Sequence, residues 1–77
     1  MMRWPHPVDP FLPRLEGYEV ARVPGVRAGK PYRCPSCGGE IAIGVGHVVA
    51  WPEDLVEDRR HWHEHCWRLA TRRGRVT

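Results

Sequence analysis

The residues best suited to chemistry in this sequence are three cysteines and a nearby histidine. Cys34-x-x-Cys37 is followed, after 25 intervening residues, by His63-x-x-Cys66. Two cysteines three apart in a loop rich in Gly and Pro can place both sulfurs on one ion, and positions i and i+3 of a helix share one face. Thiolate and imidazole suit zinc, and four such ligands close a structural site. The spacing therefore predicts one structural Zn²⁺ bound by Cys34, Cys37, His63 and Cys66.

The choice of histidine has alternatives. If the segment that precedes the helix is extended, His61 and His63 point to the same side, so His61 can compete for the ion. His65 is adjacent to Cys66, which makes joint ligation awkward. His47 is expected to be an ordinary strand residue. The plainest alternative is three free thiols and a helical histidine with no metal.

The elements that position these residues must belong to one small domain, because 77 residues leave room for only one hydrophobic core. A core of this size is marginal, and a cross-link such as a bound metal helps to stabilise it. We predict a small α+β metal-stabilised domain, with an extended Pro-rich arm at residues 1–17 and a zinc-binding domain at residues 18–77, whose zinc core spans 34–73. Alternation predicts strands at 18–23, 40–43, 47–51 and 59–62, with turns at Pro24-Gly25 and 44–46. A helix is expected from about His63 to Arg73, ended by Gly74.

The arm contains Pro5, Pro7, Pro10 and Pro13, which exclude a helix there. Trp4, Phe11 and Leu12 are apolar enough to dock on a surface. Trp51, Trp62 and Trp67 bracket the predicted metal site, and we interpret them as core residues rather than base-stacking platforms.

The charge is segregated along the chain. Residues 1–33 carry six basic and three acidic residues, residues 34–66 carry two and six, and residues 67–77 carry four and none. A polyanion would therefore meet the basic ends. No apolar run opens the sequence or approaches the length of a membrane span, so a cytoplasmic protein without a membrane partner is expected. Three cysteines cannot all pair as disulfides within one chain, which also favours metal binding.

Within residues 34–67 the arrangement of Cys-x2-Cys, hairpin and His-x2-Cys at a helix start resembles a treble-clef zinc finger. The run Arg60-His61-Trp62-His63-Glu64-His65-Cys66-Trp67 resembles the zinc finger of the poly(ADP-ribose) polymerase type, in which an aromatic-rich stretch leads into His-x-x-Cys. The resemblance implies the same four zinc ligands. The DNA-end-reading residues of that family do not carry over, because the intervening segment is shorter and acidic. The Cys-x2-Cys, Val-Val-Ala-Trp-Pro and Arg-Arg-His-Trp-His runs are also similar to short uncharacterised actinobacterial proteins.

Catalysis and nucleotide binding have little support in the sequence. Residues 24–31 miss the phosphate-loop pattern, because Pro24 and Pro31 replace the required Gly and Ser or Thr. A closed four-ligand site leaves no position for a catalytic water. A nuclease with a histidine-rich finger remains an alternative, although a second element to complete such a site is missing. We therefore expect no enzyme and no nucleotide cofactor.

Two functions remain open. The first is a nucleic-acid-binding zinc finger that contacts DNA or RNA through its basic arm and its Arg-rich helix. Arg68, Arg72 and Arg75 form one helical stripe, with Arg73 beside it, and such a stripe can neutralise phosphates. The second is a protein-interaction or assembly module that docks on a larger machine, such as the ribosome or RNA polymerase, through residues 1–15.

Overall fold

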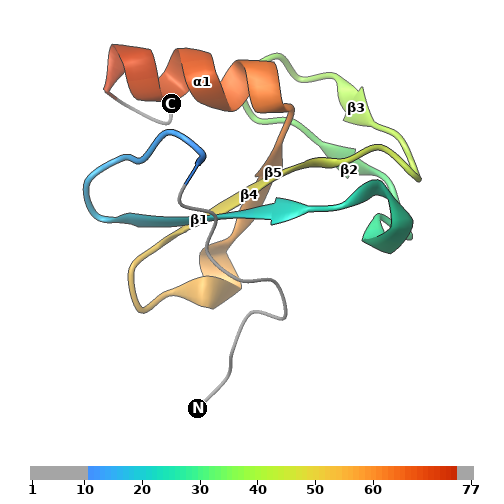
Figure 1. The fold of residues 1–77 in the computed structure, drawn as a ribbon, viewed down its shortest axis with the longest axis horizontal. Coiled ribbons are helices and arrows are strands. Elements are labelled where there is room, and N and C mark those ends of the chain that lie inside the picture. Colours follow the sequence, from blue (N-terminus) through green and yellow to red (C-terminus); the bar gives the residue numbers. More distant parts are fainter. Residues whose placement is uncertain (1–10, 75–77) are drawn as a thin grey trace.

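A three-stranded antiparallel sheet supports one helix and borders a short separate hairpin (Figure 1). The computed structural model describes residues 11–74. The sheet has the order β1-β4-β5, and β2 pairs with β3 to form the hairpin. The elements are β1 Tyr18–Val23, β2 Tyr32–Arg33, β3 Glu40–Ile41, β4 His47–Pro52, β5 Arg60–Trp62 and α1 Glu64–Arg73, with 3-10 turns η1 Gly25–Arg27 and η2 Val56–Asp58.

Strand β4 is the centre of the sheet. Its first five residues are buried. The strand has a neighbouring strand on each edge, and both faces of the sheet are covered at this point. Val20 lies opposite Ala50 in the pairing with β1, and Val48 lies opposite Trp62 in the pairing with β5. The two-residue alternation then gives the sheet two buried faces.

Each face of the sheet has its own apolar cluster. The helix side holds Val20, Val48, Ala50 and Trp62 together with Cys34, Ile41, Cys66, Trp67 and Ala70. The other side holds Ala21, Val23, Val49 and Trp51, with Ala28 and Val56 packed from the loops. The four candidate metal ligands therefore lie beside the first cluster only.

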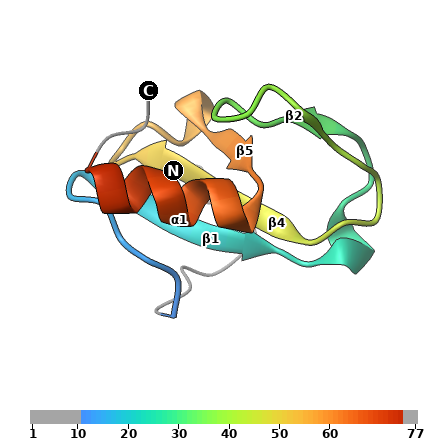
Figure 2. The ribbon, with the colours of Figure 1, turned by 90° about the horizontal axis from the view of Figure 1, so that it is seen from above.

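Helix α1 lies across the first face, as the view from above shows (Figure 2). It begins at Glu64, one residue later than expected, with His63 as its extended N-cap. Its buried residues are Cys66, Trp67 and Ala70, which share one helical face. Gly74 ends the helix in the left-handed conformation, and its N–H donates to the carbonyls of Ala70 and Thr71. The expected glycine stop is therefore confirmed.

The pairing expected for residues 40–43 is wrong. The sequence suggested a hairpin between 40–43 and 47–51, but β3 ends at Ile41 and pairs with β2. Both edges of β4 are occupied, by β1 and β5. The 42–46 turn instead folds against the segment after η1, where the Gly44 N–H donates to the Ala28 carbonyl at 2.9 Å.

The segment before β1 contributes to the core. Leu12 is buried in the helix-side cluster, whereas Phe11 is exposed. The indole N–H of Trp67 donates to the Pro13 carbonyl at 2.8 Å. The remainder of the predicted arm, including Trp4, lies outside the described residues.

Trp67 is completely buried and meets Trp62 edge to face, with ring centroids 5.4 Å apart. We expect Trp67→Ala to lower the free energy of unfolding by about 3–5 kcal/mol, because it leaves a cavity and removes the bond to Pro13. Urea unfolding measures the change. Val26→Ala, at an exposed position, is the control and should unfold at the wild-type urea concentration. Equal stability of Trp67→Ala and wild type would contradict the packing role.

Candidate metal centre

Two separate parts of the fold bring the four predicted ligands together. Cys34 and Cys37 lie in the tight connection between β2 and β3, where the Gly38 N–H donates to the Cys34 carbonyl at 2.9 Å. His63 is the N-cap of α1, and Cys66 lies in its first turn. The ligand atoms of Cys34, Cys37, His63 and Cys66 all lie within 4.8 Å of one another.

The spacing of these atoms fits a tetrahedral ion. The Nδ1 atom of His63 lies 3.4 Å from the Cys37 sulfur and 3.9 Å from the Cys66 sulfur. Ligands at the zinc bond lengths of 2.0–2.3 Å have tetrahedral edges of about 3.5–3.8 Å. The group of three cysteines and one histidine can therefore bind one metal ion with little movement.

The imidazole of His63 is oriented for this role. Its Nε2 atom lies 3.2 Å from the Glu40 carbonyl oxygen, which can only accept a hydrogen bond. Nε2 therefore carries the proton in the neutral ring, and the Nδ1 lone pair faces the three sulfurs. A hydrogen bond of this kind on the outer nitrogen fixes the tautomer of metal-binding histidines.

Two of the three thiols have pKa values that are shifted in opposite directions. Burial of Cys34 opposes ionisation, but the backbone N–H groups of Cys37, His63 and Ser36 outweigh it and lower the pKa of Cys34 to about 6. Burial and the neighbouring sulfurs of Cys34 and Cys37 raise the pKa of Cys66 to about 11. One thiolate thus forms readily and the next is opposed, so a bound cation is what would allow all three to ionise.

Backbone contacts keep the connection between β2 and β3 compact. The Gly39 N–H donates to the Cys37 sulfur at 3.3 Å, and a Cβ on Gly39 would lie 3.3 Å from the same sulfur and 3.8 Å from the His63 ring. The Arg33 guanidinium donates to the Gly38 carbonyl at 2.6 Å. Sequence reasoning did not identify these supports, because backbone carbonyls and a glycine's missing side chain leave no motif.

His61, the alternative ligand, belongs to a different cluster. Its Nδ1 lies 2.7 Å from the Nε2 of His47, and the Nδ1 of His47 donates to the Val45 carbonyl at 2.9 Å. In the neutral pair, Nε2 of His47 must therefore accept from Nδ1–H of His61. The His61 ring also stacks on Tyr32, with centroids 3.5 Å apart. This packing holds His61 away from the four-residue group, and His65 is exposed on α1.

Three of the four arginines predicted to contact nucleic acid lie on the described part of α1. Arg68 bonds to Glu64 one turn earlier, and Arg22 of β1 bonds to the other oxygen of the same carboxylate at 2.6 Å. Hydrogen bonds from Arg22 and Arg68 hold the pKa of Glu64 below its usual value. Arg72 and Arg73 are exposed in the last turn of α1, and Arg75 lies outside the described residues.

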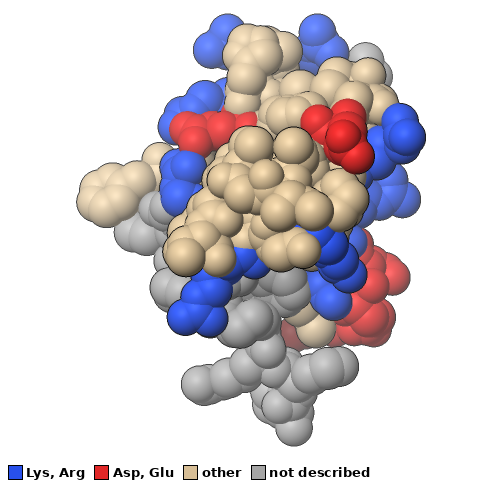
Figure 3. Space-filling model, turned by 90° about the vertical axis from the view of Figure 1, so that its right-hand side faces the viewer, with Lys and Arg blue, Asp and Glu red and all other residues tan. Residues whose placement is uncertain are grey.

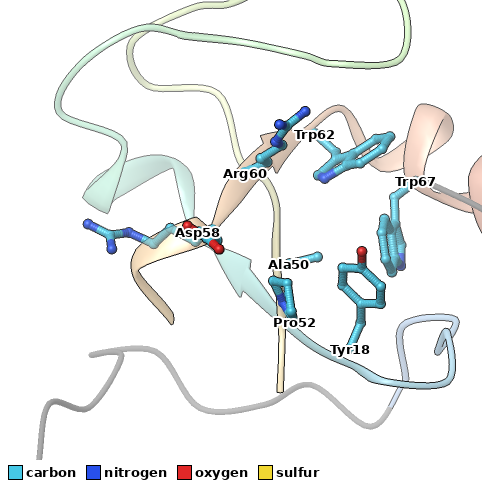
Figure 4. Close-up of a pocket in the computed structure, with 8 residues that line it drawn as sticks. Tyr18, Ala50, Pro52, Asp58, Arg60, Trp62 and Trp67 are labelled. Atoms are coloured by element: carbon cyan, nitrogen blue, oxygen red, sulfur yellow. The ribbon is translucent and has the colours of Figure 1, made fainter. Parts of the chain in front are cut away.

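A cleft lies on the helix side of the sheet, where α1 leaves the ends of β4 and β5 uncovered (Figure 4). Tyr18, Trp62 and Trp67 line one side of it, and Asp58 lies on the other. Trp62 and Trp67 are nevertheless at most 2 % exposed. Their rings therefore serve as core residues, as expected, and contribute only edges to the cleft.

Comparison with known proteins places the chain in a family. The family model described as Rv1322 family protein matches residues 13–68, a segment that contains all four candidate ligands. The chain belongs to the Rv1322 family. The uncharacterized proteins Rv1322 of Mycobacterium tuberculosis and Mb1356 of Mycobacterium bovis are each 48 % identical in an alignment of 80 positions that covers 91 % of this chain and 82 % of each relative. The expected similarity to short uncharacterised actinobacterial proteins is confirmed.

No solved structure matches the chain. Within residues 11–74, no helix is long and apolar enough to cross a membrane.

Substitution of each histidine ranks the candidate ligands. We expect His63→Ala to weaken zinc binding by more than the roughly 10–100-fold typical of losing an outer-shell contact, and His61→Ala and His65→Ala to weaken it less. Competition with a chromogenic chelator measures the affinities, and circular dichroism checks that each variant is folded. If His61→Ala were the weakest binder of the three, the placement of the helix start at the metal would be wrong.

Proposed function

We propose that this chain is a non-catalytic zinc-binding module whose fold is stabilised by one structural Zn²⁺. The observation that carries the proposal is the closed group of Cys34, Cys37, His63 and Cys66, with its histidine tautomer held by a backbone carbonyl. Four protein ligands leave no position for a reactive water, which favours a structural over a catalytic ion. Three thiolates suit zinc better than magnesium or calcium, which prefer oxygen ligands.

The order of elements supports a treble-clef arrangement around the ion. A Cys-x2-Cys turn between β2 and β3 is followed by the β4–β5 hairpin and then by α1, whose start supplies the other two ligands. The resemblance to the poly(ADP-ribose) polymerase type of finger rests on the sequence around His63 alone. The reduced thiols that such a site requires favour a cytoplasmic location.

Metal content tests this proposal directly. Purified protein should contain about one zinc per chain, and Cys34→Ser or Cys66→Ser should unfold it, because structural zinc contributes roughly 10 kcal/mol or more in small fingers. Elemental analysis and circular dichroism during chelator titration measure both effects. A well-folded, metal-free sample would contradict the structural role of zinc.

For the partner of this module, we propose nucleic acid bound at a helix arginine face, defined as Arg22, Arg68 and Arg72. Arg68 and Arg72 are one turn apart and exposed on α1. Glu64 bonds both Arg22 and Arg68, which holds two guanidinium groups on one side of the helix around a single carboxylate. A net positive, pre-ordered set of arginines suits phosphate contacts, because a guanidinium group can donate two parallel hydrogen bonds to one phosphate.

Salt dependence separates phosphate binding from other roles. If the helix arginine face binds DNA or RNA, each Arg→Ala change at Arg68 or Arg72 should reduce the slope of log K against log salt by about one unit, because fewer counterions are released. Fluorescence anisotropy at several salt concentrations measures the slope. Arg27→Ala is the matched control, since it removes one exposed arginine on another surface.

The control should leave the slope unchanged. Zinc-loaded protein that shows no binding to either nucleic acid at low salt would exclude this partner while leaving the zinc proposal intact.

A further inference from the structure

An aliphatic surface is exposed at the end of the molecule where η1 meets the 42–46 turn. Val26, Ile43 and Val45 are 92 %, 64 % and 45 % exposed. They account for three of the five large hydrophobic side chains that are exposed in the described part of the chain. Residues 42–46 carry no charge. We call this set of three side chains the aliphatic end.

The aliphatic end is held rigidly. The Gly44 N–H donates to the Ala28 carbonyl at 2.9 Å, and the Ala28 N–H donates to the Gly25 carbonyl at 3.1 Å. A Cβ on Gly25 would come within 2.5 Å of the Gly44 oxygen, so the two backbones approach as closely as glycine permits. Ala28 itself is buried in the core. The surface is therefore ordered before any partner binds, which lowers the entropic cost of docking.

Basic side chains from the segment that contains η1 border this surface on one side. Segment 24–30 contributes Arg27 and Lys30 and no acidic residue. Lys30 is positioned over the Tyr32 ring, 5.4 Å from its centroid. Figure 3 looks onto this end of the molecule, where an uncharged area fills the centre. Lys and Arg side chains lie along its lower edge, and Asp and Glu side chains lie at its upper left and upper right. A matching partner would present apolar side chains together with carboxylates.

The loop between β4 and β5 has those complementary properties. We call residues 53–58 the acidic loop; it contains the carboxylates of Glu53, Asp54, Glu57 and Asp58. Leu55 stands among them and is 44 % exposed. Hydrogen bonds from the Leu55 N–H to Pro52 and from the Asp58 N–H to Leu55 fix the loop, and Val56 anchors it against the core.

We propose that the aliphatic end of one copy of the chain docks on the acidic loop of a second copy. Val26, Ile43 and Val45 would pack against Leu55, while Arg27 and Lys30 would meet the surrounding carboxylates. Opposite charges steer the encounter and fix its orientation, and the aliphatic contact supplies the buried centre. Because the two surfaces differ, the contact is heterologous, and it need not close after two copies. The contact is small, so association is weak and depends on concentration.

Two blocked variants test the pairing. Val26→Asp removes the aliphatic end, and Leu55→Asp removes the acidic loop's apolar centre; both positions are exposed, so neither change should unfold the chain. Sedimentation velocity on zinc-loaded wild-type protein should show mass increasing with concentration, whereas each variant alone should remain monomeric. An equimolar mixture of the two should form a dimer, because each retains the surface that the other lacks. A wild type that stays monomeric, or a mixture that does, would overturn the proposal.

Charge exchange provides an independent measurement. Arg27→Glu with Lys30→Glu should abolish self-association, and a second chain carrying Glu57→Lys and Asp58→Lys should restore association only when mixed with the first. Phe11→Asp, at an exposed hydrophobic residue outside both surfaces, should associate like wild type. Loss of association in Phe11→Asp would overturn the assignment of the contact. So would Val26-dependent binding of a monomeric wild type to phosphatidylglycerol vesicles, which would assign the aliphatic end to a lipid surface.

Discussion

The meeting of three cysteine sulfurs and one imidazole at one point is the constraint on which the arrangement of this chain depends. The ligand atoms of Cys34, Cys37, Cys66 and His63 lie within 4.8 Å of one another. Backbone N–H groups lower the pKa of Cys34, whereas burial, together with the neighbouring sulfurs, raises the pKa of Cys66. Folding of the backbone brings the sulfurs together. A bound cation would favour their deprotonated forms and would coordinate them. The geometry of the site therefore suits a cation, and the charge of a bound cation would favour ionisation of the buried thiols.

The β2–β3 hairpin depends on this site more than the three-stranded sheet does. The three-stranded sheet has an apolar cluster on each face, and β1 and β4 pair over six residues. The β2–β3 hairpin has only two residues in each strand, too few to be stable alone. Its attachments include Cys34 and Ile41 in the helix-side cluster, the stacking of Tyr32 on His61, and the hydrogen bond from His63 to the Glu40 carbonyl. A metal bridge from this hairpin to α1 would thus tie a two-residue-per-strand hairpin to the helix that packs on the sheet.

The parts of this structure that sequence reasoning could predict are those governed by local rules. The i, i+3 spacing of His63 and Cys66, the alternation in β1 and β4, and the Gly74 stop are each readable within one element. The β2–β3 pairing could not be predicted, because strands of two residues have no measurable period. In addition, the turn at 44–46 suggested that residues 40–43 pair with 47–51. The spacing to Cys66 favoured His63 over His61, but the reason that His61 stays away from the site was beyond the sequence. It depends on His47 and Tyr32, which reach His61 only through the tertiary fold. The pairing of Arg22 with Glu64, 42 residues apart, is invisible for the same reason.

Glu64 links the charged surface of the helix to the metal site. It occupies the first turn of α1, directly after His63, where a carboxylate interacts favourably with the positive end of the helix dipole. The hydrogen bonds from Arg22 and Arg68 keep it ionised, because they lower its pKa. A lowered pKa means that this contribution is present above the ordinary glutamate range and is lost as the pH falls through the folded-state value. Acidification would therefore act on α1 at the turn that carries two candidate ligands, both by protonating Glu64 and by protonating the thiolates that a metal needs. The same carboxylate that orders the arginines of the helix face thus supports the helix start on which Cys66 depends.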